Sequence, residues 1–160
     1  MLTPERVARA WASPVHRYCR RMMPSEAEAD DAAQEALIKV VRHLDRYDRT
    51  RPLAPWVYGI ARNTCLDALR RRTHKREDDA VEVIDPAPGA LVLVDEAQTA
   101  ARVRRALVTL PDLYRDVLVL YHYENLKYVE IAESLDVPLG TVMNRIFRAR
   151  QKMREALEVA

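Results

Sequence analysis

Apolar residues recur with a helical period near the C-terminal end of the chain. The recurring positions, at spacings of four, three and four residues, are Val142, Ile146, Ala149 and Met153. At about 100° per residue these positions share one side of a helix. The other side carries residues that donate hydrogen bonds, contact a methyl group or bind phosphate, namely Thr141, Asn144, Phe147, Arg148 and Gln151, with Arg145 and Lys152 near the boundary. The pattern predicts an amphipathic helix with a basic outer face.

A shorter helical pattern precedes this helix. Its expected inward stripe is Val129, Ala132 and Leu135. The turn between the two helices is expected at residues 136–138, and Gly140 marks the start of the second helix. Two helices around a tight turn, the second of them basic, are typical of a helix-turn-helix that reads the major groove of DNA. A plain helical hairpin with a solvated basic face is the alternative.

The N-terminal part of the chain, residues 1 to about 73, has the pattern of three or four helices. Ser25 followed by Glu28 indicates a capping box that starts a helix running to about Leu44. Its inward stripe is expected to be Ala33, Leu37, Val40 and Leu44. Beside that stripe lies a polar flank with one apolar member, formed by Asp31, Gln34, Glu35 and Ile38. This flank is either a solvated face or a docking surface for a partner helix.

An Arg-rich loop, DRYDRTRPLAP, follows, and then a helix that begins at WVYGIARN and ends in a run of cations. The cations are Arg70, Arg71, Arg72, Lys75 and Arg76. Complementing the helix dipole accounts for only part of that charge. We therefore expect the basic helix to track a phosphate backbone. Six residues at helical spacing in the same helix are expected in the core, namely Trp56, Val57, Ile60, Ala61, Ala68 and Leu69.

Charge is strongly segregated along the 160 residues, although the net charge is only +2. Residues 39–76 hold eleven Lys and Arg against three acids, whereas residues 77–96 hold seven acids and no Lys or Arg. Pro86, Pro88 and Gly89 break any helical period in the acidic stretch. This organisation predicts an all-α chain with two small helical domains, residues 1–73 and 97–160, joined by a flexible acidic linker at 74–96.

Several classes of function have no support in the sequence. The two cysteines, Cys19 and Cys65, form no CxxC pair, and the four histidines are scattered. The chain has no Gly-rich phosphate loop, nucleophile elbow or HExxH motif. We expect no metal, no cofactor, no small-molecule substrate and no enzymatic activity. Without a signal-peptide core or a bilayer-length apolar run, the protein is expected in the cytoplasm.

Four motifs occur in an order and at spacings that resemble one known family. They are DDAAQEALIKV, PWVYGIARNTCLDALRRR, LPDLYRDVLVLYHYENLKYVEIAESLDVPLGTV and NRIFRAR. Together they resemble the bacterial RNA polymerase sigma factors of the extracytoplasmic-function (ECF) type, in the sigma-70 family, which keep only regions two and four. The resemblance implies a non-catalytic subunit that binds core polymerase, recognises promoter DNA and helps to open the duplex. It also implies regulation by an anti-sigma factor that can hold the protein at the inner face of the membrane.

The resemblance also implies roles for individual residues. The surface that docks on the clamp coiled coil of the large polymerase subunit would comprise Asp31, Gln34, Glu35 and Ile38. The loop at residues 47–54 would capture a flipped base of the minus-ten element, and the basic helix after it would track that strand; the residues involved would be Tyr47, Arg49, Arg51, Arg62, Asn63, Arg70 and Arg71. The minus-thirty-five element would be read by Thr141, Asn144, Arg145, Phe147 and Arg148.

Two residues depart from the family pattern. Met143 stands where the family often has Lys or Arg, and Asn144 stands where Ser is common, so the upstream sequence preference is open. Two other classes of function compete with the sigma factor: a stand-alone regulator that binds an operator through its helix-turn-helix, and an adaptor that binds polymerase without DNA. The DDAAQE flank combined with the basic loop and helix favours the sigma factor.

Overall fold

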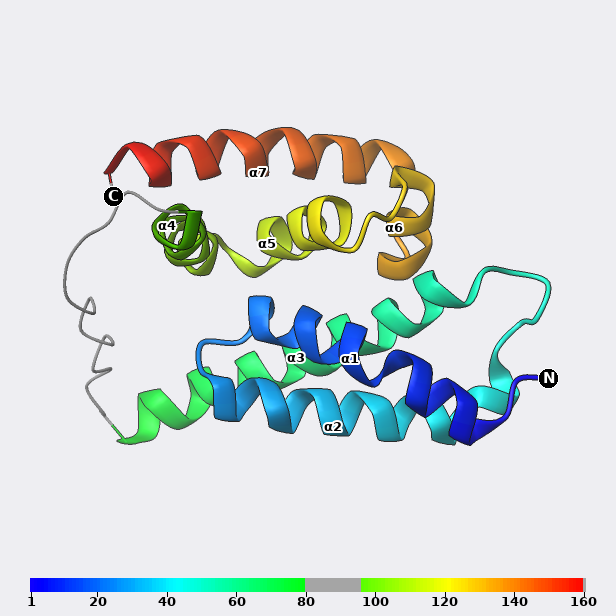
Figure 1. Cartoon of the computed structure of the whole chain (residues 1–160). Coiled ribbons are helices and arrows are strands. Elements are labelled where there is room, and N and C mark those ends of the chain that lie inside the picture. Colours follow the sequence, from blue (N-terminus) through cyan, green and yellow to red (C-terminus); the bar gives the residue numbers. More distant parts are fainter. Residues whose placement is uncertain (80–95, 160) are drawn as a thin grey trace.

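The computed structural model describes residues 1–79 and 96–159 and is all-helical over these two ranges. The N-terminal module consists of α1 (Pro4–Met22), α2 (Glu26–Arg42), the short 3-10 helix η1 (Leu44–Arg46) and α3 (Leu53–Asp79). The C-terminal module consists of α4 (Glu96–Thr109), α5 (Asp112–Leu118), the π-helical turn η2 (Val119–Tyr123), α6 (Tyr128–Leu135) and α7 (Leu139–Val159). Figure 1 shows α5 lying between α7 and the N-terminal module. The all-α prediction is confirmed.

Helix α2 starts as its sequence predicts. The Ser25 hydroxyl accepts a hydrogen bond from the Glu28 amide at 3.2 Å, and it donates one to the Glu28 carboxylate at 2.7 Å. Small buried residues line the inner face of the helix, Ala29, Ala32, Ala33 and Ala36, and they let α1 approach closely. The α-helix ends at Arg42, earlier than expected, and Leu44 is buried from η1 instead.

Helix α3 is the longest in the chain and extends further than the sequence pattern suggested. It continues past residue 73 to Asp79, so the start of the proposed 74–96 linker is helical. The rest of that linker, residues 80–95, lies outside the described residues. Val57, Ala61 and Cys65 are fully buried from α3, whereas Trp56 and Ile60 are only partly buried against the core.

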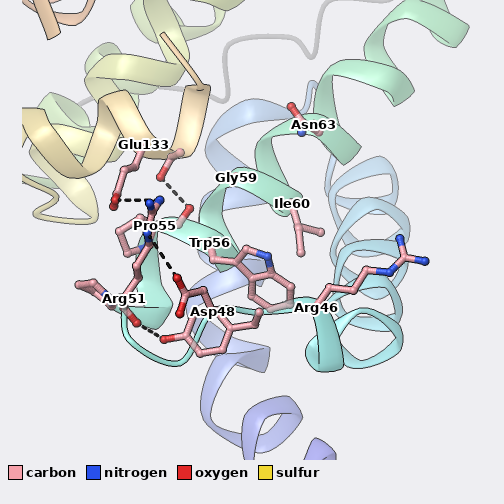
Figure 2. Close-up of a pocket in the computed structure, with 12 residues that line it drawn as sticks. Arg46, Asp48, Arg51, Pro55, Trp56, Gly59, Ile60, Asn63 and Glu133 are labelled. Carbon is pink, nitrogen blue, oxygen red and sulfur yellow. Dashed lines mark hydrogen bonds and ion pairs between the residues drawn. The ribbon is translucent and has the colours of Figure 1, made fainter. Parts of the chain in front are cut away.

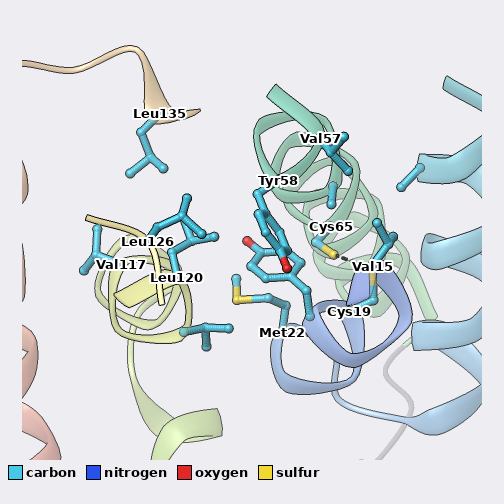
Figure 3. Close-up of a cluster of buried hydrophobic side chains, with 14 of the residues drawn as sticks. Val15, Cys19, Met22, Val57, Tyr58, Cys65, Val117, Leu120, Leu126 and Leu135 are labelled. Carbon is cyan, nitrogen blue, oxygen red and sulfur yellow. Dashed lines mark hydrogen bonds between the residues drawn. The ribbon is translucent and has the colours of Figure 1, made fainter. Parts of the chain in front are cut away.

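The two modules share one continuous core. Figure 3 shows Tyr58 and Met22 of the N-terminal module beside Leu120 and Leu126 of the C-terminal module. Helices α3 and α6 pack so closely that a Cβ atom added to Gly59 would lie 2.9 Å from the backbone oxygen of Ser134. A mid-helix glycine costs about 1 kcal/mol relative to alanine, and here its missing side chain permits the contact between the two helices.

Candidate nucleic-acid interface

The helix-turn-helix is built from α6 and α7. Helix α6 ends at Leu135, and the C-cap residue Asp136 adopts a left-handed conformation with φ 53°. The chain then turns, and the Thr141 amide donates to the Pro138 carbonyl at 3.0 Å as α7 begins. An aspartate tolerates the left-handed region better than most residues because its short polar side chain can hydrogen-bond locally. The turn at residues 136–138 is confirmed.

One element of the expected α6 packing is wrong. Val129 is 63% exposed, whereas Ile131 is fully buried and Leu135 is nearly so. Because α6 is short, its sequence is compatible with two overlapping apolar faces. The contacts with α3 and α7 bury the face that contains Ile131. The inward side of α7 is as predicted, since Val142, Ile146 and Ala149 are buried.

The outer side of α7 is available to a ligand. Asn144, Phe147 and Arg148 are exposed, while Thr141 and Arg145 are partly exposed. A Cβ atom added to Gly140 would meet no atom of the described residues within 4 Å, so the first turn of α7 is open to a close approach. The arrangement presents an amide, a guanidinium and an aromatic ring on one face, the combination that reads base edges in a major groove.

The Arg-rich loop forms one wall of a pocket of about 410 Å³ on the N-terminal module (Figure 2). Tyr47 and Trp56 are among its lining residues, with ring centroids 5.3 Å apart, and the Tyr47 hydroxyl donates to the Arg51 carbonyl. Arg46 and Asn63 line the pocket from η1 and α3. The Trp56 ring is only partly buried and lies beside cations, an arrangement suited to stacking a base and holding its phosphate, whereas Tyr47 is only 9% exposed and supports Trp56 from the core.

Helix α6 closes one side of this pocket. Ser134 donates from its hydroxyl to the Pro55 carbonyl at 2.7 Å, and the Glu133 carboxylate lies 3.5 Å from the Arg51 guanidinium. Arg51 also lies 3.7 Å from Asp48. Side chains of the C-terminal module therefore occupy part of the surface that the sequence assigned to DNA.

Arg62, predicted to track a DNA strand, is engaged within the protein. Its Nε donates to Asp116 of α5 at 2.9 Å, and the Asp116 side chain is fully buried. Burial raises the pKa of Asp116 above its ordinary value, although the charges of Arg62 and Arg145 oppose that rise. One carboxylate thus interacts with an arginine from each candidate DNA surface. Sequence reasoning did not identify Asp116, because a lone aspartate in an amphipathic helix carries no signal of burial.

The remaining cations of α3 lie on different sides of the helix. Asn63 and Arg70, seven residues apart, share a face, and Arg70 pairs with the exposed Asp67 at 3.4 Å. Arg71 and Arg72 instead contact α2, through Glu35 at 3.4 Å and Glu28 at 2.7 Å. Arg49 is exposed in the loop. The structure thus brings Tyr47, Arg51 and Asn63 together at the pocket, and it places Arg71 away from them.

The polar flank of α2 is a coherent surface. Asp31, Gln34 and Ile38 are exposed, and Ile38 is 56% exposed. Glu35 is held by Lys39 at 3.2 Å and by Arg71. Partial burial pushes the pKa of Glu35 upwards, but the hydrogen bonds and charges of Lys39 and Arg71 outweigh it and lower that pKa. Two free polar side chains and an apolar one remain available to a partner.

No helix of residues 1–79 and 96–159 is both long and apolar enough to cross a bilayer. Within the same ranges, no group of three or more His, Cys, Asp and Glu side chains is arranged to hold a metal ion.

Both modules of the chain are similar to known proteins. Residues 7–75 match the family model of sigma-70 region 2, and residues 100–153 match that of sigma-70 region 4. The ECF RNA polymerase sigma factor SigW of Bacillus subtilis is 32% identical over 154 residues, covering 89% of this chain and 82% of the relative. The ECF RNA polymerase sigma-E factor of Escherichia coli is 36% identical over 153 residues, covering 88% and 76%. The sigma factor RpoE of Bartonella quintana, solved with the anti-sigma factor NepR, has a similar fold, with a TM-score of 0.77 at 22% identity over 97% of this chain and 96% of that one.

Proposed function

The chain belongs to the sigma-70 family, among the ECF sigma factors that act in promoter-specific initiation by RNA polymerase, and we propose that its two modules read two separate promoter elements while the first also docks on the polymerase. The observation that carries this proposal is the outer face of α7, where Asn144, Phe147 and Arg148 are exposed opposite a fully buried side.

The minus-thirty-five element is the proposed ligand of α7. Thr141 and Arg145 lie at the edges of the exposed face, where they contact phosphates or base edges. Arg148 pairs with a guanine and Asn144 with an adenine, because these are the bidentate partners of the two side chains. The open space beside Gly140 lets the DNA backbone approach the first turn of the helix.

The minus-ten element is the proposed ligand of the pocket beside the Arg-rich loop. A flipped base enters near Tyr47 and Trp56, and Arg49, Arg51, Asn63 and Arg70 hold the strand around it. Extruding a base costs a few kcal/mol, which stacking and phosphate contacts offset. Because α6 closes one side of the pocket and Arg62 pairs with Asp116, full access requires α6 and α5 to move away from α3. Arg71, which faces α2, is a weaker candidate for this role.

The exposed flank of α2 is the proposed contact with the clamp coiled coil of the large polymerase subunit. Asp31, Gln34 and Ile38 are exposed and can contact a helical partner, whereas Glu35 forms ion pairs with Lys39 and Arg71.

We also propose the domain division 1–73, 74–96 and 97–160, with the first linker residues forming the end of α3. A cytoplasmic location, an anti-sigma partner and retention by it at the membrane follow from family membership as part of this proposal.

The experiment that tests the proposal is in vitro transcription by core polymerase and the purified full-length chain on a pool of random promoter sequences. The expected result is enrichment of two short elements at a fixed separation. Arg148→Ala should relax one or two base pairs of the upstream element, since a bidentate contact is worth about 1–3 kcal/mol. Arg154→Ala, also on α7 but beyond the reading turns, is the control. Sequence-specific binding without polymerase would indicate a stand-alone regulator instead.

A further inference from the structure

Three large apolar side chains form an exposed line along the first turns of α7. Leu139, Met143 and Phe147 are 43%, 51% and 67% exposed. Their spacing of four residues places them along one side of the helix surface. We call these three residues the apolar stripe. It is separate from the buried side of the same helix, where Val142 and Ile146 are almost fully covered.

The surroundings of the apolar stripe favour a polyanion as its partner. The α7 sequence from Leu139 to Arg154 contains four Arg and one Lys but no Asp or Glu. Arg145 and Arg148 lie on the same turns as Met143 and Phe147. A polyanion releases its counterions when it binds such cations, and this release favours binding. An apolar helix of a partner protein would instead leave the cations without partners. These surroundings therefore fit nucleic acid better than an apolar protein surface.

Only one apolar group is displayed by the bases in the major groove, the 5-methyl group of thymine. The other base edges present hydrogen-bond donors and acceptors, which a thioether or phenyl side chain cannot satisfy. Asn144, adjacent to Met143 and exposed, has the two-pronged amide that pairs with adenine. The first two turns of α7 thus carry groups suited to A·T pairs.

We propose that Met143 and Phe147 select thymine methyl groups in the upstream promoter element, beside an adenine contacted by Asn144. This inference rests on the proposed function, because it requires α7 to enter the major groove. It adds the chemical class of base that the helix selects, and it makes Met143 a determinant of specificity. Leu139, the least exposed member of the apolar stripe, lies at the edge of the contact.

The test uses the full-length chain with core polymerase on the promoter selected from the random pool. Each thymine of the upstream element is replaced in turn by deoxyuridine, which keeps base pairing and removes only the 5-methyl group. We expect affinity to fall about three- to fivefold at each contacted thymine, the effect of withdrawing one methyl group from a buried contact. Met143→Ala should abolish the response at one thymine, and Phe147→Ala at another.

Val129→Ala is the matched control, since Val129 is similarly exposed but lies on α6. This variant should keep the full deoxyuridine response. Equal binding of thymine and uracil promoters by the unmodified chain would overturn the inference while leaving the sigma-factor proposal intact. A response that persists unchanged in both alanine variants would also overturn it and would leave the apolar stripe to a protein partner. Loss of all promoter-specific binding by the unmodified chain with polymerase would instead refute the proposed function.

Discussion

Arg62 and Asp116 form an ion pair of 2.9 Å that joins α3 of the N-terminal module to α5 of the C-terminal module. The carboxylate is fully buried, and its second oxygen has no hydrogen-bond partner among residues 1–79 and 96–159. A buried pair of this kind stabilises little by itself, but removing one partner leaves an uncompensated charge. The packing of the two modules therefore depends on Arg62, a side chain that the sequence assigned to DNA binding.

Arg62→Leu should destabilise the chain markedly. The buried carboxylate of Asp116 would lose its partner, and the expected loss in the free energy of unfolding is about 3–5 kcal/mol, measured by urea denaturation. The double variant Arg62→Leu with Asp116→Asn should recover part of that loss. Arg70→Leu is the control, because its partner Asp67 is exposed and surface pairs contribute about 0–1 kcal/mol. Equal effects of the Arg62 and Arg70 substitutions would refute the coupling.

Asp116 should also make stability depend on pH. Burial raises the pKa of Asp116 in the folded chain, so the folded state binds more protons than the unfolded state above the ordinary aspartate value. The free energy of unfolding then falls as the pH rises through the raised pKa. In Asp116→Asn this contribution is absent. The difference in unfolding free energy, variant minus wild type, should become more positive as the pH rises from the ordinary aspartate pKa through the raised pKa of Asp116; parallel curves would contradict the assignment.

Two glycines provide a matched pair of tests. Gly59→Ala places a Cβ atom 2.9 Å from the Ser134 backbone oxygen, and overpacking of this kind costs about 1–3 kcal/mol. Gly140→Ala places one in open space, where a helical alanine gains up to about 1 kcal/mol. Denaturation should therefore show opposite signs for the two substitutions. If both variants were stabilised, α3 and α6 would not be in contact in solution.

The thiols of Cys19 and Cys65 should be unreactive in the native chain. Both are fully buried, with Sγ atoms 3.5 Å apart. The hydrogen bond that Cys65 donates to Cys19, together with burial, raises the pKa of the Cys65 thiol far above its ordinary value. Because the thiolate is the reactive species, Ellman's reagent should detect the two thiols only after urea is added. Rapid reaction without urea would show that α1 and α3 separate readily.

Helix periodicity predicted much of this fold. Helix α7 is long and packs on one side only, so the period of its apolar residues correctly identified the buried positions Val142, Ile146 and Ala149. The same reasoning failed for Val129, because α6 is short and contacts helices on more than one side. It also gave no sign that α3 continues past residue 73 to Asp79, since the charged end of this helix has no apolar stripe to follow.

The candidate site was predictable in composition but not in arrangement. The family resemblance implied a loop that captures a base, and Tyr47, Arg51 and Asn63 do line one pocket, whose role in binding DNA stays a prediction. The contacts made by Arg62, Arg71 and Gly59 were not foreseen, because they depend on Asp116, Glu35 and Ser134, partners 54, 36 and 75 residues away along the chain. Such long-range pairings have no periodic signature in a sequence.

Asp31→Lys should weaken binding to core polymerase without reducing stability. Asp31 is exposed on the flank of α2 proposed to dock on the clamp coiled coil. Reversing its charge there disrupts the proposed contact, an effect that appears mainly in the association rate and its salt dependence. Asp45→Lys is the matched control, since Asp45 is also exposed but lies on η1, outside that flank. Fluorescence anisotropy of the labelled full-length chain titrated with core polymerase measures both affinities. The docking surface is misassigned if the two reversals weaken binding equally, because the loss would then reflect net charge alone rather than the position of Asp31.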